Sequence, residues 1–327
     1  MKLLITFKVK ESYKNIIENI LSPYVELLYL DENDHTNRHD LLSKVDIIFA
    51  WNISKELKTE DYTNLKKCKF IQLLSAGANH IPFKCVSENI IISSNVGAYA
   101  KPMAEHVISL LFALSKSLLE RHNELKNKLF NQYKLNKLIE GSTCGILGFG
   151  GIGKAVVNLL RPFQVKIFAI NTTGKTDLQI DFIGTLKDLD YVLKNVDFLV
   201  ITLPLNKYTY NLIDTNKLNI MKKDAILVNV ARGDILVEKD FYIFLKNNPE
   251  FKAGIDAWWI EPFSHGFFKT NFPFFDLPNF LGSPHNSAIV PGVIEEALVK
   301  ASENILNFIN NKYIKGIVNR EDYDFNF

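Results

Sequence analysis

A glycine-rich turn between an expected strand and an expected helix most strongly constrains the fold of this chain. The segment Gly148-Phe149-Gly150-Gly151-Ile152-Gly153 matches the pattern G-x-G-x-x-G and follows the apolar run Thr143–Leu147. In such a turn the first glycine permits the bend, the second lets the backbone approach a diphosphate, and the third lets the helix pack on the strand. The N–H groups and dipole at the start of the expected helix, Gly151–Leu160, would favour that diphosphate. The pattern therefore predicts a dinucleotide-binding unit.

Short apolar runs alternate with helical stretches on both sides of this turn. Strands are expected over residues 3–7, 25–30, 46–50, 70–74, 143–147, 165–170, 197–202, 225–230 and 253–257. Helices are expected over residues 13–21, 151–160 and 188–194, and a polar loop over 31–40. This alternation predicts βαβ units built around parallel sheets.

Two longer helices frame the second block of strands. Apolar residues at helical spacing from Met103 to Leu118 predict a long helix, and the Asn- and Lys-rich stretch Lys116–Glu140 predicts a linking arm on the surface. An amphipathic pattern predicts a last helix over Val293–Ile309. We therefore expect an α/β fold of two doubly wound parallel-sheet domains. An NAD(P)-binding Rossmann domain, residues 99–285, is inserted into a flavodoxin-like substrate-binding domain, residues 1–98 and 286–327.

Composition narrows the class of protein. The 327 residues suffice for two domains, and a net charge of +2 without basic clusters predicts no nucleic-acid partner. No apolar run approaches the ~18 residues that span a bilayer, and Lys8 interrupts the start before a signal-peptide core can form. The three cysteines, Cys68, Cys85 and Cys144, have no C-x-x-C spacing. We expect a cytoplasmic protein with reduced thiols, no membrane partner and no metal site.

The residues after the expected strand 165–170 bear on the choice of dinucleotide. An NAD site usually has Asp or Glu here to bind the ribose hydroxyls. This chain has Asn171, Thr172 and Thr173, followed by Lys175. Because no carboxylate would repel a 2′-phosphate, the sequence favours NADP slightly over NAD. Lys175 as an ordinary solvated charge is equally compatible with the pattern.

Polar residues also follow three strands of the second block. Arg232 comes after 225–230, Asp256 follows Ala253-Gly254-Ile255 with Glu261 five residues on, and His285 lies in the later loop Gly282–Asn286. Ligands bind outside the carboxyl ends of parallel strands in such sheets. These side chains are therefore candidates for the chemistry.

Several stretches, in this order, together resemble one known family. They are Leu74–Ile81, Ala104–His106, Gly148–Gly153, Leu203–Leu205, Asn229–Gly233, Asp256–Pro262, Ser283–His285 and Val318–Arg320. The chain resembles the D-isomer-specific 2-hydroxyacid dehydrogenases, which include glyoxylate/hydroxypyruvate reductases, D-lactate dehydrogenases and phosphoglycerate dehydrogenases. The resemblance covers most of the chain.

The resemblance implies an oxidoreductase that moves a hydride between NAD(P)H and C2 of a small 2-keto or 2-hydroxy acid. His285 would give a proton to the C2 oxygen or take it back, which suits an imidazole near neutral pH. Glu261 would orient the ring and favour its charged form. Arg232 would clamp the substrate carboxylate and polarise the carbonyl with its paired donors.

The resemblance implies further contacts. The substrate-binding residues would be Ser75, Ala76, Gly77 and Ala78, whose small side chains let backbone N–H groups approach an anion. The cofactor-binding residues would be Gly148, Gly150, Gly151, Ile152, Asn171, Thr172, Thr173, Leu203, Pro204, Val230, Ala231 and Asp256. Asp256 would act near the nicotinamide or through neighbouring residues. Glyoxylate, hydroxypyruvate or another short keto acid is the expected substrate, and a homodimer is expected through the Met103–Leu118 helix and the arm after it.

Other functions compete with this one. A dinucleotide-sensing binding protein, like the C-terminal-binding corepressors, would have the same fold and catalytic groups, although the chain lacks the disordered tails typical of recruitment proteins. A formate dehydrogenase would pair its histidine with Gln rather than Glu261. A purely structural protein would have no use for the His, Glu and Arg set.

The sequence leaves the roles of several aromatic residues open. Trp258 and Trp259 could equally shape the substrate pocket or bury against a partner subunit. The Phe-rich stretch 267–280 is expected to pack between domains, as is His106.

Overall fold

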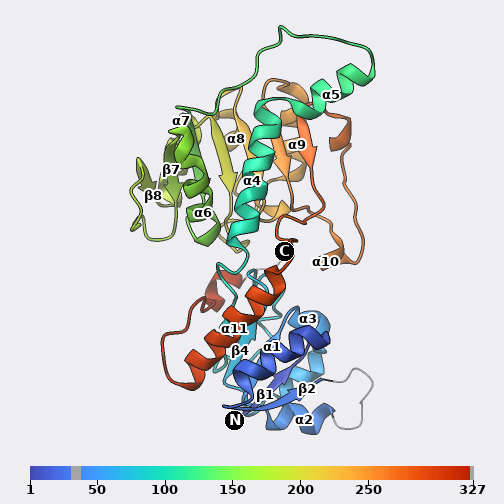
Figure 1. Cartoon of the computed structure of the whole chain (residues 1–327), viewed down its shortest axis with the longest axis vertical. Coiled ribbons are helices and arrows are strands. Elements are labelled where there is room, and N and C mark those ends of the chain that lie inside the picture. The colour runs from blue at the N-terminus through green and yellow to red at the C-terminus, as the bar shows by residue number, and fades with distance from the viewer. Residues whose placement is uncertain (31–37, 325–327) are drawn as a thin grey trace. The chain divides into compact units, whose positions relative to one another are not determined.

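The computed structural model describes residues 1–30 and 38–324, which form two compact units (Figure 1). The first unit consists of Met1–Tyr99 with Val290–Phe327, and the second consists of Ala100–Ile289. Each unit contains a parallel sheet, so the expected α/β fold with two parallel sheets is confirmed. Within the described ranges, no helix has both the length and the apolar character needed to cross a bilayer.

The first unit has a five-stranded sheet in the order β2-β1-β3-β4-β5, the flavodoxin-like order. The strands are β1 Lys2–Ile5, β2 Glu26–Tyr29, β3 Ile47–Ala50, β4 Phe70–Leu73 and β5 Ile91–Ser93. The helices are α1 Glu11–Leu21, α2 Arg38–Lys44, α3 Ile53–Glu56 and α11 Val293–Ile309, with single 3-10 turns at Thr59–Asn64 and Arg320–Tyr323. Helices α1 and α11 pack together, and Ile305 of α11 is buried in one cluster with Phe49 and Phe70.

The expected loop over residues 31–40 ends earlier than predicted. Residues 31–37 lie outside the described ranges, but α2 already begins at Arg38. The Arg38 guanidinium forms a largely buried ion pair with Asp61, at 2.6 Å, and donates to the Glu56 carbonyl. These partners are distant in sequence, so the local polarity of the segment gave no sign of the helix.

A cluster of neutral polar groups ties α11 to the sheet of the first unit. The buried Asn304 amide donates to Gln72 Oε1 at 2.7 Å, to Ser93 Oγ at 2.9 Å and to the Lys315 carbonyl at 3.0 Å. Its carbonyl oxygen accepts the Lys315 N–H. This Asn304 cluster (Asn304, Gln72, Ser93 and the Lys315 backbone) joins β4, β5, α11 and the chain that follows α11.

The second unit has a seven-stranded sheet in the order β12-β11-β10-β9-β6-β7-β8. The strands are β6 Thr143–Leu147, β7 Lys166–Ile170, β8 Phe182–Gly184, β9 Phe198–Ile201, β10 Ile226–Asn229, β11 Lys252–Ile255 and β12 Phe280–Gly282. The helices are α4 Ala100–Ser115, α5 Leu118–Lys126, α6 Gly151–Leu160, α7 Leu189–Asn195, α8 Thr215–Asn219, α9 Glu238–Asn247 and α10 Pro262–His265. Single 3-10 turns lie at Arg161–Phe163, Leu186–Asp188, Gly233–Ile235 and Phe274–Asp276.

Two strands of this sheet were absent from the sequence prediction. Both β8 and β12 have three residues and lie at the two edges of the sheet. A run of three is too short to show a strand period, so only pairing with β7 and β11 defines them.

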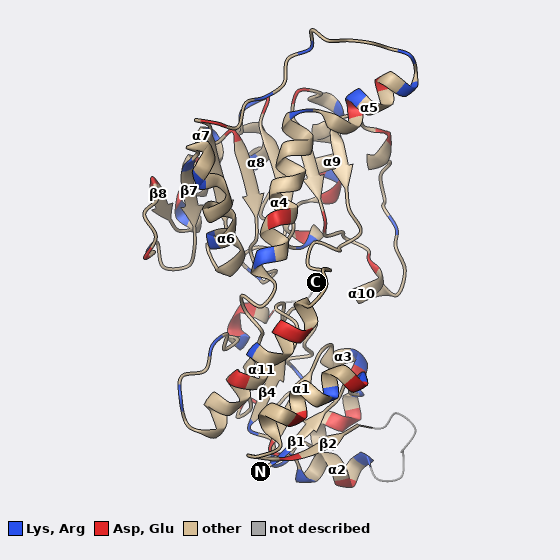
Figure 2. Cartoon of the chain, viewed as in Figure 1, with Lys and Arg blue, Asp and Glu red and all other residues tan. Residues whose placement is uncertain are grey.

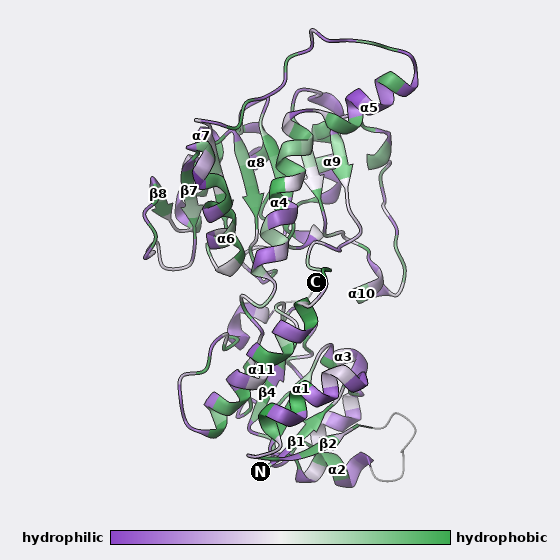
Figure 3. Ribbon diagram, in the orientation of Figure 1, coloured by the Kyte–Doolittle hydropathy of each residue, from purple (hydrophilic) through white to green (hydrophobic). Residues whose placement is uncertain are grey.

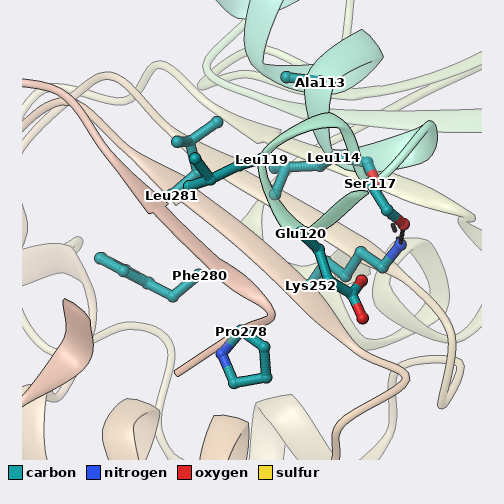
Figure 4. A pocket seen from close by; sticks show the side chains of 9 residues that line it. All are labelled: Ala113, Leu114, Ser117, Leu119, Glu120, Lys252, Pro278, Phe280 and Leu281. Carbon is teal, nitrogen blue, oxygen red and sulfur yellow. Dashed lines mark hydrogen bonds between the residues drawn. The ribbon is translucent and has the colours of Figure 1, made fainter. Parts of the chain in front are cut away.

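The polar stretch Lys116–Glu140 is not wholly an extended arm, because Leu118–Lys126 forms helix α5. Ser117, with a left-handed φ of 50°, separates α5 from α4. Lys252, at the start of β11, donates to the Leu114 carbonyl at 3.1 Å and to Ser117 Oγ at 2.5 Å, and so closes the end of α4 (Figure 4). A basic group there also complements the helix dipole.

A small hollow surrounds this junction (Figure 4). It is lined by Ala113, Leu114, Ser117, Leu119, Glu120, Lys252, Pro278, Phe280 and Leu281. Because Lys252 begins β11, the hollow lies at the amino edge of the sheet, away from the edge where ligands bind in such folds.

Hydropathy and charge follow the layers of each unit. The strands are drawn mostly in apolar colours (Figure 3), while Lys and Arg are interspersed with Asp and Glu on helices and loops of both units (Figure 2). The long α4 buries Ala104, Val107 and Leu111 in one cluster with residues of α6 and β10. The apolar stripe predicted from Met103 onward is therefore the buried face of α4.

Candidate active site

The candidate residues of the second unit gather at the carboxyl edge of its sheet. Arg232, Asp256 and His285 follow β10, β11 and β12, which are neighbours in the sheet. The glycine turn, Asn171 and Leu203 follow β6, β7 and β9. Because all seven strands are parallel, these loops leave the sheet at one edge.

The three glycines at the fixed positions of the pattern, Gly148, Gly150 and Gly153, meet the three demands of a diphosphate site. Gly148 has a φ of +97°, and a Cβ there would lie 2.7 Å from the Leu203 nitrogen and the Thr202 carbonyl. A Cβ on Gly153 would lie 2.7 Å from the Gly148 carbonyl oxygen, so α6 packs closely on the turn. Around Gly150, by contrast, nothing lies within 4 Å of a Cβ. The backbone is therefore open to an anion at the position where a diphosphate must approach.

Helix α6 begins immediately at this open position. Gly150 is its N-cap, and the first N–H of the helix ladder is that of Lys154, which donates to the Gly150 carbonyl. The N–H groups before Lys154, including those of Gly151 and Ile152, precede the helix's own hydrogen bonds. Thr202 Oγ1 donates to the Gly148 carbonyl at 2.6 Å and steadies the turn. These groups fit a dinucleotide diphosphate.

The loop after β7 is shaped by Asn171. Its side-chain oxygen accepts the N–H groups of Thr173 at 3.0 Å and Gly174 at 2.7 Å, and its amide donates to the Lys175 carbonyl at 2.8 Å. Thr172, Thr173 and Lys175 are exposed. The loop therefore presents hydroxyls and a cation where an acidic residue is usual.

Asp177, two residues after Lys175, has a cationic partner. Exposed Asp177 forms an ion pair with Lys154 of α6. That lysine, through its side-chain hydrogen bond, lowers the pKa of Asp177.

His285 and Glu261 form a direct pair. His285 Nδ1 lies 2.7 Å from Glu261 Oε2, with the carboxylate buried and the histidine side chain 30% exposed. An ionised carboxylate can only accept, so the proton of this bond lies on Nδ1. The bond to Glu261 therefore uses Nδ1 and not the other ring nitrogen, Nε2.

A buried carboxylate holds the loop that carries His285. Asp256 is fully buried, and it accepts Ser283 Oγ at 2.6 Å, the Asn286 N–H at 3.1 Å and the Ser287 N–H at 3.0 Å. Burial alone would raise the pKa of Asp256, but the hydrogen bonds from Ser283 and Ser287 outweigh it and lower that pKa. The donors flank His285, whose φ of +52° is rarely adopted by a side-chain-bearing residue. The carboxylate thus maintains a strained backbone.

The loop of Arg232 is fixed from its main chain. Buried Asn229 accepts the Ala231 N–H at 3.0 Å and donates to the Arg232 carbonyl at 2.8 Å. The Arg232 guanidinium itself donates to the Ala231 carbonyl. A Cβ on Gly233 would lie 2.4 Å from the Trp258 carbonyl carbon, so this loop packs on the backbone that leads to Glu261.

Trp258 and Trp259 belong to the core of the second unit, which neither of their predicted roles described. Both indoles are more than 90% buried; Trp259 stacks on Phe274, and Trp258 Nε1 donates to the Ser283 carbonyl at 2.8 Å. The prediction that 267–280 packs between domains was also wrong for Phe274 and Phe280. Both are buried in this unit's core, where Phe280 contacts Trp258 and Phe274 contacts Trp259.

Two residues of the second unit, His106 and Asp234, have surroundings that the sequence did not predict. His106 was expected to pack between domains, but its Nε2 lies 2.9 Å from Ser283 Oγ and 3.7 Å from Asp256 Oδ1 within the same unit. Burial, the largest influence, raises the pKa of Asp234 to about 6, and Glu261 contributes in the same direction. Neither role has a local sequence signal, because the partners are distant in the chain.

The predicted substrate loop, Ser75–Ala78, lies in the first unit after β4, at the carboxyl edge of that sheet. Ser75 Oγ donates to the Gly77 carbonyl at 3.0 Å, Ala76 is exposed and Ala78 is buried. The entry to the loop is held at Leu74, whose carbonyl accepts the Tyr99 hydroxyl at 2.8 Å.

The remaining predicted cofactor residues lie in turns of the second unit. Leu203, Val230 and Ala231 are buried, whereas Pro204 is exposed. Across residues 1–30 and 38–324, no three His, Cys, Asp or Glu side chains are grouped so that they could hold a metal ion.

Comparison with known proteins identifies the fold and the family. The family model of the "D-isomer specific 2-hydroxyacid dehydrogenase, NAD binding domain" matches residues 108–287. The glyoxylate reductase of Thermococcus onnurineus is 28% identical over 331 residues, covering 98% of this chain and 96% of the relative.

Solved structures agree with this match. A crystal structure from Pyrobaculum aerophilum, provisionally named a formate dehydrogenase, has a TM-score of 0.84 and 25% identity, covering 99% of this chain and 100% of that one. A glyoxylate reductase structure from Paecilomyes thermophila has a TM-score of 0.79 and 22% identity, covering 98% and 99%.

Proposed function

The chain belongs to the D-isomer specific 2-hydroxyacid dehydrogenase family, and we propose that it reduces glyoxylate or a similarly short 2-keto acid with NADPH. Membership makes it an NAD(P)-dependent oxidoreductase. The choice of substrate, the preference for NADPH and the residue roles are our proposal. The observation that carries it is the 2.7 Å pair of His285 and Glu261 on a loop fixed by buried Asp256.

His285 serves as the acid in this proposal. When a hydride adds to C2, the carbonyl oxygen becomes an alkoxide that must gain a proton, and Nε2 of the imidazolium supplies it. Glu261 keeps the ring oriented and stabilises its positive charge through Nδ1–H. In the reverse direction Nε2 takes the hydroxyl proton as the hydride leaves.

Arg232 binds the carboxylate of the keto acid. A planar guanidinium offers paired donors and stays charged at any working pH. The hydrogen bonds of Asn229 and the close packing of Gly233 fix the main chain on both sides of Arg232. This precision supports a residue whose donors must meet a small anion in one orientation.

The glycine turn, Asn171, Thr172 and Thr173 hold the dinucleotide, together with turns at Leu203, Pro204, Val230 and Ala231. When bound, NAD(P)H supplies the hydride. The open backbone at Gly150 accommodates the diphosphate, and Asn171 in place of an acid permits a 2′-phosphate. Exposed Lys175 adds positive charge to the same loop. These features favour NADPH.

In this proposal Ser75, Ala76, Gly77 and Ala78 of the first unit contribute to binding the substrate carboxylate. Their small side chains leave the backbone N–H groups accessible to a carboxylate. A short keto acid agrees with the names of the curated relatives, which include several glyoxylate reductases.

The test follows absorbance of the reduced nicotinamide with NADPH and NADH against glyoxylate, hydroxypyruvate, pyruvate and a bulky 2-keto acid. We expect oxidation with glyoxylate or hydroxypyruvate, faster with NADPH. Activity confined to the bulky acid, or a clear preference for NADH, contradicts the corresponding part. No turnover with intact cofactor binding favours a dinucleotide-sensing role.

The similarity to a provisionally named formate dehydrogenase suggests an alternative function, the oxidation of formate. Formate oxidation leaves carbon dioxide and no oxygen that needs a proton. The His285–Glu261 pair, which is built to hold and release a proton, favours keto-acid reduction. An assay with formate and NAD+ or NADP+ tests this, and turnover there contradicts the proposal.

We further propose that the chain forms a homodimer through α4 and the arm after it. The arm exposes Phe130, Tyr133 and Leu135, each more than 75% accessible. Large apolar groups gathered on one segment mark a contact surface. Solution scattering at micromolar concentration should give the mass of two chains, and the mass of one chain contradicts this.

A further inference from the structure

The residues that carry this inference surround Ser283, which is bonded through every polar group it has. Its N–H donates to the Ile255 carbonyl at 2.9 Å, and its carbonyl accepts Trp258 Nε1 at 2.8 Å. Its hydroxyl lies 2.6 Å from Asp256 Oδ1 and 2.9 Å from His106 Nε2. We call Asp256, Ser283, His106 and the N–H groups of Asn286 and Ser287 the Asp256 cluster.

The direction of these hydrogen bonds follows from proton counting. A serine hydroxyl has one proton and can accept two bonds. The ionised Asp256 carboxylate can only accept, and at 2.6 Å it is much closer to the Ser283 hydroxyl than the other acceptor, the Ile255 carbonyl at 3.5 Å, so the Ser283 proton points to Asp256. The contact with His106 can then exist only if His106 Nε2 carries a proton and donates. His106 is therefore a donor into a chain that runs from Nε2 through Ser283 to Asp256.

The position of α4 makes this contact possible. Leu110 and Leu114, one and two turns after His106, pack on Gly254 of β11, with a contact as close as 3.0 Å to the position of a Cβ there. Residues four apart share a helix face. The same face therefore runs along β11 and brings His106 to the carboxyl end of that strand, beside Asp256.

We propose that His106 is a positioning residue for His285. By donating to the Ser283 hydroxyl, His106 holds that hydroxyl in its hydrogen bond to Asp256. Asp256 in turn accepts the two N–H groups that follow His285, those of Asn286 and Ser287. The left-handed backbone of His285 persists only while that loop is held. The inference rests on the proposed function, because His285 is the proposed acid. It assigns His106 no contact with substrate.

The test compares His106→Leu, which loses the donor, with His106→Gln, whose amide can still donate. Exposed His39 on α2, outside the proposed site and the proposed dimer contact, provides the matched control, His39→Leu. Each variant is assayed for kcat and KM with glyoxylate and NADPH. In substrate-free protein, hydrogen exchange is followed at the Asn286 and Ser287 amides.

For His106→Leu we expect kcat to fall about 10-fold and exchange at Asn286 and Ser287 to rise about 10-fold, because a small misplacement of an acid slows proton transfer. The KM for NADPH should stay within about 2-fold. His106→Gln and His39→Leu should resemble wild type in both readouts. If His106→Leu fails to fold, Ser283→Ala should give the same two changes, because it breaks the same chain.

Unchanged kcat and exchange in His106→Leu would overturn the inference. So would a His106→Gln variant as impaired as His106→Leu, because the imidazole itself would then be required. Absence of turnover in wild type would contradict the proposed function instead, and the exchange rates would still test whether His106 holds the loop.

Discussion

The two units each bury a polar cluster, and the clusters differ in charge and in what they hold. The Asn304 cluster is made of amides, a hydroxyl and backbone groups, and it joins secondary-structure elements to the chain after α11. The Asp256 cluster contains a carboxylate without surface exposure, and it holds a loop with a left-handed residue.

The difference has an electrostatic basis. Separating a neutral amide from its partners costs about 1–3 kcal/mol, whereas a buried carboxylate that loses its donors costs more. The Asp256 loop therefore cannot move away without exposing a charge to an apolar environment. The charged Asp256 cluster therefore fixes the loop of His285 more firmly than a neutral cluster could. The neutral Asn304 cluster mainly stabilises packing.

Replacement of His285, which lies within the loop that Asp256 holds, should have the largest effect on activity. His285→Ala should lower kcat by about 10²-fold or more, because general acid catalysis supplies that much. Binding of NADPH, followed by fluorescence titration, should remain intact. Near-normal turnover with glyoxylate would reject His285 as the acid.

Asp256→Asn should affect both activity and stability. The amide presents two N–H groups in place of one acceptor, so at least one donor of the loop loses its partner. We expect kcat to fall about 10-fold and the free energy of unfolding, measured in urea, to fall by about 2–4 kcal/mol. A loss of stability with unchanged kcat would show that the cluster does not position His285.

Asn304→Leu should distinguish the role of the Asn304 cluster in stability from the role of the Asp256 cluster in activity. It leaves Gln72, Ser93 and the Lys315 N–H without this partner, and we expect the free energy of unfolding to fall by about 1–3 kcal/mol. At temperatures where the variant is folded, kcat should equal that of wild type. A matching fall in kcat would mean that the neutral cluster also shapes the active site.

Replacement of Asp234 should have the smallest effect on stability. The pKa of Asp234 is raised, whereas that of Asp256 is lowered. Burial raises the pKa of Asp234 from its ordinary 3.8 to about 6, so its contribution to stability is present below pH 3.8 and is lost as pH rises through 6. Asp234→Asn should therefore be more stable than wild type at pH 7.5, by about 1–2 kcal/mol. Urea unfolding at pH 4 should show no such gain in stability for the variant. A variant and a wild type of equal stability at both pH values would contradict the destabilising charge of Asp234.

The sequence by itself determined the features that depend on local pattern. The glycine turn, the strand before it and α6 could be predicted because bend, open approach and close packing each require glycine at a fixed spacing. The strands β3, β6 and β9 could be predicted from their apolar runs, because both faces of these strands are buried. Helix α11 could be predicted from its amphipathic pattern, because one face of the helix is buried. The resemblance to the family rested on the same short stretches.

Only the tertiary structure decided how the candidate residues are held. Ser283 lies 27 residues from Asp256 and 177 from His106, and no local pattern encodes which donor meets which acceptor. The edge strand β12 likewise depends on a partner elsewhere in the chain, β11. The family resemblance could propose His285 as an acid with Glu261 as its partner, but burial and hydrogen bonds over long sequence distances fix the geometry of these residues.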